Sequence, residues 1–419
     1  MSSNPMHGRD LSRPEFIALI AAFMMLNALA IDVMLPALPQ MAHSLHVMNE
    51  NDRHWVILAY TLGLGVAQLA FGPLSDRFGR RVPMFAGVAI YAAASLAAIV
   101  APSWGALIAL RVVQGIGGAS TRVISMSIVR DRYAGRAMAE VMSLIFMVFL
   151  VIPIVAPSIG QVIMLAGPWQ MIFAVMGVMA VLTIAWGHFR LPETLARADR
   201  RPLTLRATAA AFRIVVTNRV AFMYGLAGMF MFACIMMFVP TSQQIYVDVY
   251  ELGPWFPVAF GGTAALMAVG SFINARVVAR FGMRRISHFA ILVFSTLGAV
   301  WLVCAMFGAV PFLVFFPIMA ICMLMFGWAS SNMNALSMEP LGAVAGTASS
   351  VFGFIQTVGG VLIGGYLGSF YNGTTLPLAA GFLAMGIAAL ICIVVAEKGR
   401  LFGVGAEYAH GRNSLRAKH

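Results

Sequence analysis

Two residues of opposite charge lie inside apolar stretches of this sequence, where an unpaired charge is costly. Asp32 is the one acidic residue, of fifteen in the chain, that falls well inside such a stretch, and Arg111 lies inside another. A charge in hydrocarbon costs about 3 kcal/mol or more, so such residues usually pair or line a pathway. Desolvation favours a neutral carboxyl and a nearby arginine favours a charged one, so this carboxyl could bind and release a proton. We therefore predict that Asp32 and Arg111 couple proton movement to function.

Tyr60 is predicted to lie at the same depth within its apolar stretch as Asp32 and Arg111 do within theirs. Asp32, Tyr60 and Arg111 each lie about six residues from the same end of their apolar stretches, which is ~9 Å along a helix. Neighbouring helices could bring the three side chains together, although the sequence leaves open whether they do.

A second arginine lies on the same predicted helix face as Arg111. Arg122 follows it by about three helical turns, and Gln114 and Ser125 fall on the same stripe. The stripe indicates a polar cavity beside this helix. The alternative for Arg122 is that its side chain extends toward the headgroups at the membrane surface.

These residues require membrane-spanning helices to hold them. Of the 419 residues, 61% are hydrophobic and 10% are charged, whereas soluble domains have about a quarter of their residues charged. Apolar blocks of about twenty residues recur, which is the length of a helix that crosses ~30 Å of hydrocarbon. The sequence predicts an all-α membrane protein with about twelve spans, near 16–38, 54–72, 83–101, 105–129, 138–163, 169–189, 217–239, 255–278, 287–307, 311–334, 343–368 and 377–396.

Basic residues mark one side of the membrane. They follow the second, fourth, eighth and twelfth spans and crowd the loop after the sixth, whereas the opposite loops carry almost only Arg53. Because cytoplasmic loops hold the excess of Lys and Arg, both termini are predicted to be cytoplasmic. The net charge of +12 follows from this topology. A nucleic-acid-binding protein would gather its basic residues on one surface, so no nucleic-acid partner is expected.

The chain divides near its middle into two related halves. We expect two pseudo-symmetric six-helix bundles at 1–190 and 217–396, a basic cytoplasmic linker at 191–216 and a cytoplasmic tail at 397–419. A repeat supports this division. The loop after the second span reads GPLSDRFGRR from Gly72 to Arg81, and a shorter copy, RFGMRR from Arg280 to Arg285, follows the eighth span. Transporters are often built from such repeats, with the substrate site near the midplane between them.

The first of these loops resembles the signature of the major facilitator superfamily. Gly72 permits close helix approach, Gly79 suits a tight turn and Asp76 can pair with an arginine. The resemblance implies a cytoplasmic latch formed by Gly72, Asp76, Arg77, Gly79 and Arg80, which closes that side while the transporter faces outward. The alternative is a basic loop that only sets the topology.

Two further segments are similar to those of proton-coupled drug exporters in that superfamily. The sequence RVVQGIGG from Arg111 to Gly118 is similar to their arginine-bearing fourth-helix motif. The sequence IDVMLPALP from Ile31 to Pro39 resembles the first span of the bicyclomycin- and florfenicol-exporter branch. The resemblance covers nearly the whole chain, and it is strongest in the N-terminal half.

The predicted fifth span contains a proline- and glycine-bearing segment, PIVAPSIGQ. Pro153, Pro157 and Gly160 are similar to the antiporter motif of drug exporters, but Ala156 and Gln161 stand where glycines are typical. The departures weaken the antiporter inference. The alternative is an ordinary proline-kinked, closely packed helix.

The C-terminal half has no acidic residue, Lys or Arg deep in its spans. Tyr224, Asn332 and Gln356 are its candidate cavity residues, together with the methionines and phenylalanines, of which the chain has thirty each. Methionine repacks easily, so this half could form an adaptable apolar wall. The alternative for each such residue is ordinary core or lipid-facing filler. A cavity with one acid and one or two arginines favours neutral or weakly acidic amphipathic compounds, such as phenicol drugs, over dications.

The sequence thus predicts a monomeric proton-coupled antiporter of the inner membrane that exports amphipathic small molecules. It predicts no cofactor beyond the proton gradient and no metal, because the four cysteines fall in apolar spans without ligand-like spacing. An uptake symporter for a sugar or metabolite would use the same fold and remains the alternative. An enzyme is not expected, because no histidine lies in the middle of a span.

Overall fold

The computed structural model describes residues 11–133, 135–200 and 212–403, and its regular structure in these ranges is helical, with no strand among them. The predicted all-α class is therefore confirmed. The chain forms two compact units, Met1–Thr204 and Leu205–His419, here called unit 1 and unit 2. The boundary between the units falls within the stretch 191–216 that the sequence marks as a linker.

The described residues of unit 1 form six long α-helices and one short one. They are α1 (Arg13–Asp32), α2 (Leu38–Ser44), α3 (Trp55–Phe78), α4 (Arg81–Ala98), α5 (Trp104–Arg132), α6 (Gly135–Ala166) and α7 (Gln170–Arg190). Polar side chains begin two of them, because the first backbone N–H groups of a helix lack partners. Ser12 Oγ accepts a hydrogen bond from the Glu15 N–H (3.4 Å), and Ser103 Oγ accepts one from the Ala106 N–H (3.3 Å).

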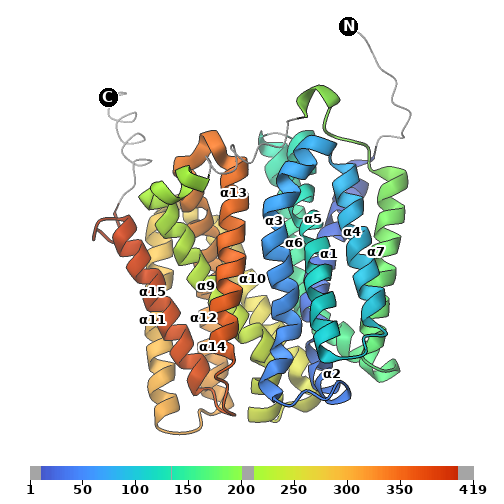
Figure 1. Cartoon of the computed structure of the whole chain (residues 1–419). Helices are drawn as coiled ribbons and strands as arrows, with labels where there is room; N and C mark the ends of the chain where they lie inside the picture. The colour runs from blue at the N-terminus through green and yellow to red at the C-terminus, as the bar shows by residue number, and fades with distance from the viewer. Residues whose placement is uncertain (1–10, 134, 201–211, 404–419) are drawn as a thin grey trace, which may run out of the picture. The chain divides into compact units, whose positions relative to one another are not determined.

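Unit 2 repeats this plan with one of its spans interrupted. Its helices are α9 (Arg219–Gln243), α10 (Phe256–Phe281), α11 (Met283–Met306), α12 (Phe312–Met338), α13 (Ala345–Phe354), α14 (Gly360–Gly368) and α15 (Leu376–Ala396). A π-helical segment, Ile355–Gly359, joins α13 to α14 in one line (Figure 1), and the two correspond to the single span predicted at 343–368.

The distribution of side chains is that of a membrane protein. Leu182 on α7 is 62% exposed and Leu313 on α12 is 85% exposed, whereas Arg111 on α5 is fully buried. Within the described residues, eleven helical segments are long and apolar enough to cross a membrane, and Val151–Ala166 on α6 is a shorter apolar one. This agrees with the prediction of about twelve spans.

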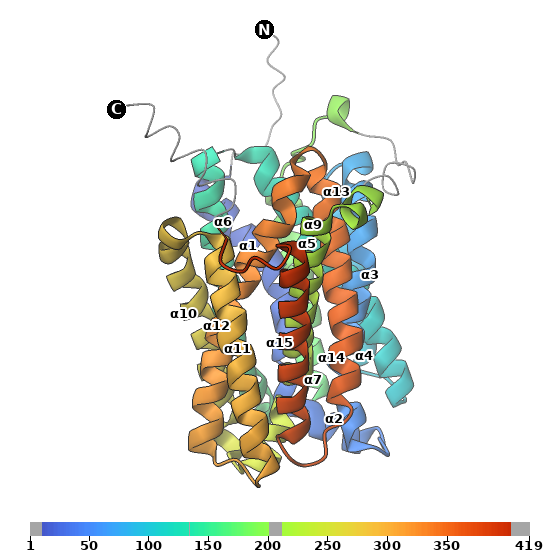
Figure 2. The same cartoon turned by 90° about the vertical axis from the view of Figure 1, so that its left-hand side faces the viewer.

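The same helix pairs pack together in both units. In unit 1, α1 packs against α5, α6 and α7; in unit 2, α9 packs against α12, α14 and α15. Likewise α5 packs against α3 and α4, as α12 does against α10 and α11, and α4 packs against α7 as α11 does against α15. Figures 1 and 2 show the helices of each unit running side by side. The repeat seen in the two arginine-rich loops thus extends through the helix packing.

Close contacts between glycines and carbonyl groups repeat as well. Gly63 on α3 lies against the Val112 carbonyl of α5, and Gly115 on α5 lies against the Tyr60 carbonyl of α3, so that a Cβ at either glycine would overlap the oxygen. The same reciprocal pair recurs between α10 and α12, where Gly270 meets the carbonyl of Leu324 and Gly327 meets that of Met267. The α3–α5 contact of unit 1 is therefore repeated by α10 and α12 in unit 2.

Candidate functional site

Asp32 is the last residue of α1, where the first span breaks. The Val33 N–H still bonds to the Leu29 carbonyl (3.1 Å), and a 3₁₀ turn at Leu35–Ala37 then leads into α2. Pro36 accounts for the break, because proline disfavours the α conformation of the residue before it. The span predicted near 16–38 lies within the membrane-crossing segment Arg13–Ser44, and the break falls inside that segment. An unbroken helix would have kept Asp32 within a hydrogen-bonded turn.

The Asp32 carboxyl is nearly buried and unpaired. Its exposed fraction is 5%, and within the described ranges no residue forms an ion pair or hydrogen bond with it. Its place at the C-terminal end of a helix adds the negative end of the helix dipole. A carboxylate is costly in such surroundings unless something compensates its charge.

Arg111 on α5 does not pair with Asp32 here. Its guanidinium instead donates to the carbonyl of Ala30 on α1 (2.8 Å), to that of Val56 on α3 (2.8 Å) and to Gln114 Oε1. The last carbonyls of a helix lack backbone partners, so the break after Asp32 leaves the Ala30 carbonyl available to the arginine. Arg111 therefore caps α1 two residues before Asp32 and ties α1, α3 and α5 together.

A buried relay orients Arg111. Gln114 Nε2 donates to Ser95 Oγ on α4 (2.7 Å), and Ser95 donates to the Tyr91 carbonyl (2.7 Å). Tyr91 in turn donates to the carbonyl of Leu26 on α1 (3.0 Å). Sequence reasoning placed Gln114 in a cavity, and the structure places it 99% buried between the arginine and α4.

Tyr60 belongs to the same buried cluster. The Arg111 guanidinium carbon lies 4.6 Å from the centre of the Tyr60 ring, and the Tyr60 hydroxyl donates to Asn27 Oδ1 on α1 (2.6 Å). Asn27 also donates to Thr121 Oγ1 on α5. Sequence reasoning missed Asn27, although an amide in an apolar span little more than one turn from Asp32 was a usable signal.

The two arginines of α5 have different surroundings. Arg122 is exposed, and among the described residues it has no hydrogen-bond or ion-pair partner. Ser125, close by on the same stripe, is fully buried, and its hydroxyl has no partner within the described chain. The stripe predicted from the sequence is therefore split between a packed end at Arg111 and an accessible charge at Arg122.

The proline-bearing helix α6 packs directly on the break in α1. A Cβ at Gly160 would overlap the Val33 carbonyl oxygen and lie 3.4 Å from Pro36 Cδ. Pro153 and Pro157 lie within the same helix. The segment that resembles the antiporter motif thus contacts the residues that directly follow Asp32.

The latch residues surround Arg80, between α3 and α4. Its Nη1 donates to Asp76 Oδ1 (2.6 Å) and Ser75 Oγ (2.9 Å), and its Nε donates to Asp131 Oδ2 at the end of α5 (2.7 Å). Burial by itself would lower the pKa of the Arg80 guanidinium, but hydrogen bonds to Asp131 and Asp76 outweigh it and raise the pKa. The arginine therefore stays charged and crosslinks the ends of three helices.

Two further features of this loop are the backbone conformation of Gly79 and a contact with Glu193. Gly79 has φ = +90°, which favours glycine, and the Glu193 carboxylate accepts the N–H groups of Arg80 (2.7 Å) and Arg81 (3.2 Å). Glu193 is distant in sequence and was not predicted. The Gly72 carbonyl accepts a hydrogen bond from the Ser75 hydroxyl. Arg77 is exposed, and its guanidinium lies over the Phe78 ring.

Unit 2 contains a rebuilt copy of this charge cluster. Gly282 has φ = +81° in the equivalent turn, and Arg284 binds Glu339 after α12 (2.8 Å) and Glu397 after α15 (3.0 Å). Glu339 and Glu397 come from the ends of α12 and α15, as Asp131 and Glu193 come from the ends of α5 and α7. Ala279 stands in the second loop where the first loop has Asp76. A charge cluster still forms in unit 2, because Arg284 lies one position further along its loop than Arg80 does.

The matched glycine contacts show what replaces the charged residues in unit 2. Gly364 on α14 meets the Ala233 carbonyl as Gly160 meets that of Val33, so Phe232 precedes this contact as Asp32 precedes the other. The α10–α12 contacts likewise match Met267 to Tyr60 and Met323 to Arg111. Apolar residues stand at all three places.

The three polar residues predicted for unit 2 do not lie together. The Tyr224 hydroxyl donates to Glu397 (2.8 Å) in the charge cluster. Asn332 on α12 exchanges two hydrogen bonds with Asn274 on α10 and is 97% buried. Gln356, in the π-helical segment, donates to the Gly228 carbonyl of α9 (3.3 Å).

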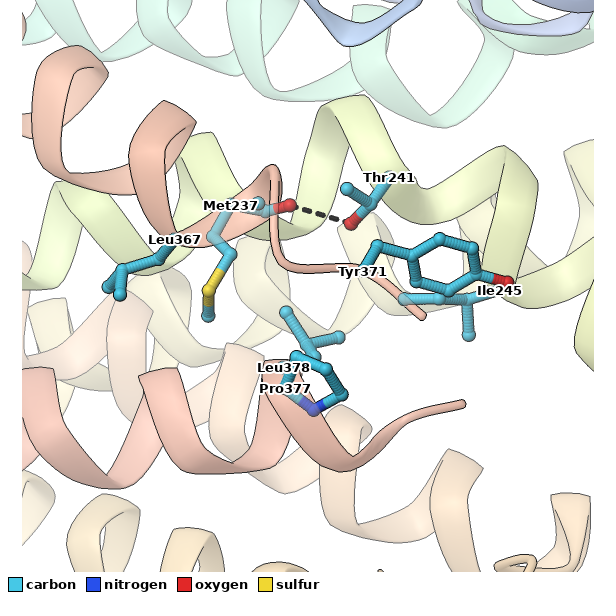
Figure 3. Close-up of a pocket in the computed structure, with 8 residues that line it drawn as sticks. Met237, Thr241, Ile245, Leu367, Tyr371, Pro377 and Leu378 are labelled. Carbon is cyan, nitrogen blue, oxygen red and sulfur yellow. Dashed lines mark hydrogen bonds between the residues drawn. The ribbon is translucent and has the colours of Figure 1, made fainter. Parts of the chain in front are cut away.

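A small apolar pocket of about 210 Å³ lies elsewhere in unit 2, between α9, α14 and α15. Figure 3 shows Met237, Thr241, Leu367 and Tyr371 around it, with the Thr241 hydroxyl bonded back to the Met237 carbonyl. None of the predicted site residues lines it. In the described part of the chain no cluster of His, Cys, Asp or Glu could hold a metal ion.

Comparison with known proteins gives a consistent result. The sequence model of the Major Facilitator Superfamily matches residues 20–364. A bicyclomycin resistance protein homolog of Haemophilus influenzae is 30% identical over 384 residues, which cover 90% of this chain and 94% of that protein. The multidrug resistance protein MdtL of Escherichia coli is 27% identical over 408 residues, covering 94% and 99%. The structure of the human organic anion transporter MFSD10 aligns with a TM-score of 0.68 at 17% identity, covering 92% and 99%.

Proposed function

Because this chain belongs to the major facilitator superfamily, we propose that it is a proton-coupled antiporter that exports amphipathic small molecules across a bacterial inner membrane. Membership makes it a multi-pass membrane transporter of small molecules rather than an enzyme. Proton-coupled export is proposed mainly because the Asp32 carboxyl is unpaired at the break that follows α1. Arg111 caps α1 just before this break, and Gly160 of α6 contacts the residues just after it.

The direction of transport is inferred from the relatives. Two curated relatives that match almost end to end are named for resistance to bicyclomycin and to multiple drugs, which fits export. The contact between Gly160 and the residues after Asp32 supports the same direction, because it joins the exporter-like segment to the proposed proton site. An uptake symporter is the competing function, and nothing on the structural side favours it.

The orientation follows from the basic residues. The Gly79 and Gly282 turns and the linker carry most of the arginines near the helix ends, so we place these turns and both termini in the cytoplasm. The Arg80 and Arg284 clusters then lie on the cytoplasmic side. In our proposal the Arg80 cluster is the latch that holds unit 1 together while the cavity faces outward.

The coupling step uses Asp32 and Arg111 in turn. In the described state Arg111 is satisfied by carbonyl and amide oxygens, so a protonated, uncharged Asp32 needs no partner. Once Asp32 loses its proton, the guanidinium can move from the Ala30 carbonyl to the new carboxylate two residues on. This exchange would release the cap on α1. Protonation from the periplasm and release to the cytoplasm, on either side of the conformational change, would then drive substrate outward.

The distribution of charge between the two units suggests the class of substrate. Phe232, Met267 and Met323 leave unit 2 without charge at the matched positions, and Arg122 is an accessible cation in unit 1. This combination suits neutral or weakly acidic amphipathic compounds, such as phenicols, and disfavours dications.

The test is a susceptibility screen in an efflux-deficient bacterial host. Wild-type protein should raise resistance to a subset of amphipathic drugs, and Asp32→Asn should remove that resistance at equal expression. Asp199→Asn is the matched control, because Asp199 is an exposed linker carboxylate, and it should behave as wild type. If wild-type protein protects against no compound, or if Asp32→Asn protects equally well, the proposal fails.

A further inference from the structure

The segment that follows α15 is held in a sterically disfavoured backbone conformation. We call residues 397–403 the C-terminal strap. Within it, Lys398 has φ = +53° and Phe402 has φ = +61°, in the left-handed region that non-glycine residues rarely adopt. Such conformations persist only where surrounding contacts hold them. The contacts that hold the strap therefore decide whether it stays in place.

The main contact is with His288, a fully buried residue in the second turn of α11. The Phe402 N–H donates to His288 Nδ1 at 2.9 Å, and the Phe402 ring packs edge-on against the imidazole with centroids 5.7 Å apart. One ring nitrogen thus anchors a strained residue of the strap.

The hydrogen bonds assign the protonation state of this histidine. A backbone N–H can only donate, so Nδ1 must be an unprotonated acceptor and the single proton must sit on Nε2. Nε2 lies 3.1 Å from the Tyr224 hydroxyl, which donates onward to Glu397 Oε1 at 2.8 Å. The chain from Nε2–H through Tyr224 to Glu397 is complete only when His288 is neutral.

Protonation would break the anchor and place a charge on a fully buried ring. A proton on Nδ1 would point at the Phe402 N–H. The charged and titratable groups bonded together beside His288 are Tyr224 on α9, Arg284 one turn earlier on α11, Glu339 after α12 and Glu397 on the strap. One arginine is shared by two carboxylates there, so the release of the strap rests on the loss of the Nδ1 acceptor and not on repulsion from the cluster.

We propose that His288 is a proton-binding site, separate from Asp32, that locks the C-terminal strap when neutral and releases it when protonated. In the orientation inferred above, the strap lies at the cytoplasmic end of unit 2, so it responds to cytoplasmic acidification. Release separates Glu397 and Phe402 from Tyr224 and His288. The site does not depend on the transport cycle, and it stands whether or not Asp32 is the coupling residue.

Hydrogen–deuterium exchange of the full chain in lipid nanodiscs tests this. Protection of the strap amides, corrected for intrinsic exchange, should fall about tenfold between pH 8 and pH 4, the change expected when one buried hydrogen bond is lost. In His288→Gln the amide side chain can still accept from Phe402 and donate to Tyr224 but cannot titrate. Its strap protection should therefore not change with pH.

His188→Gln is the matched control. His188 lies at the end of α7 in unit 1 and is not one of the residues that bond to the strap, so this variant should keep the pH dependence of the wild type. Constant strap protection in the wild type over this pH range would overturn the proposal without reference to any variant. An unchanged pH response in His288→Gln with wild-type thermal stability would also overturn it.

Discussion

At the scale of single residues, Arg111 acts as a helix cap. Its three acceptors are two backbone carbonyls and one amide oxygen, from three different elements, and none is a carboxylate. Charge-assisted hydrogen bonds of this kind can offset the burial of a guanidinium. The position of Asp32 therefore depends on Arg111 even though the two side chains are not paired.

Arg111→Lys tests this geometry. An ammonium group donates from a single nitrogen and cannot reach Ala30, Val56 and Gln114 together, so buried acceptors lose their partners. We expect a destabilisation of about 2 kcal/mol, seen as a lower melting temperature in detergent, and loss of efflux. Arg122→Lys is the control, because Arg122 is exposed, and its melting temperature should stay near that of the wild type. Normal efflux by a stable Arg111→Lys variant would contradict the cap.

Asp32, Arg111 and Tyr60 could be predicted from charge and depth alone, because a charge in an apolar span is rare and costly. Their partners could not. Asn27, Ser95 and Glu193 are ordinary polar residues, and only the folded chain brings them to Tyr60, Gln114 and Arg80. The sequence left open whether Asp32 meets Arg111. In this structure the two are not paired, because equal depth does not fix which acceptor an arginine takes when a helix end supplies free carbonyls.

At the scale of elements, the first span works as two pieces. The break between α1 and α2 is set by Pro36 from within the chain and by Gly160 of α6 from outside, where backbone approaches backbone. The sequence showed the prolines and the glycine, but it gave no sign that the two segments touch. The span predicted near 16–38 lies within the segment Arg13–Ser44. The break inside it could not be predicted, because membrane helices tolerate prolines and their presence alone does not locate a break.

Gly160→Ala should disturb this contact. The new methyl group would overlap the Val33 carbonyl, so α6 or the break must shift at a cost of about 1–3 kcal/mol. We expect weaker proton-driven efflux as well as a lower melting temperature. Gly105→Ala on α5 is a matched control, since a Cβ there meets nothing within 4 Å. It should leave efflux intact and, as a helix substitution, preserve or raise stability. Equal behaviour of the two variants would disprove the role of the contact.

At the scale of the whole molecule, the two units share a scaffold and differ in chemistry. Helix pairs, glycine contacts and an arginine cluster with two acids recur in both. The proton-site residues do not recur, because Phe232, Met267 and Met323 stand in their places. The repeat of one loop in the sequence predicted the shared scaffold. It did not predict the Arg284 cluster of unit 2, because the one-residue shift to Arg284 is visible only in the contacts of that residue.

Glu193→Gln tests whether the linker is tied to the latch. The carboxylate accepts two N–H groups at the start of α4, and an amide would accept them more weakly. We expect a loss of about 1 kcal/mol in stability and faster proteolysis of the linker. Asp199→Asn, six residues further along and exposed, should change neither. A Glu193→Gln variant that melts and is cleaved like the wild type would show that this residue does not tie the linker to the latch.

The most direct test of the central claim is a proton-flux measurement in energised inside-out vesicles that carry the chain. Such vesicles have an acidic lumen, and a compound found by the susceptibility screen is added outside. Antiport through Asp32 predicts that addition of the compound makes the lumen less acidic with wild-type and Asp199→Asn protein, and has no effect with Asp32→Asn at equal expression. An unchanged or more acidic lumen with wild-type protein, or a full response from Asp32→Asn, would contradict it.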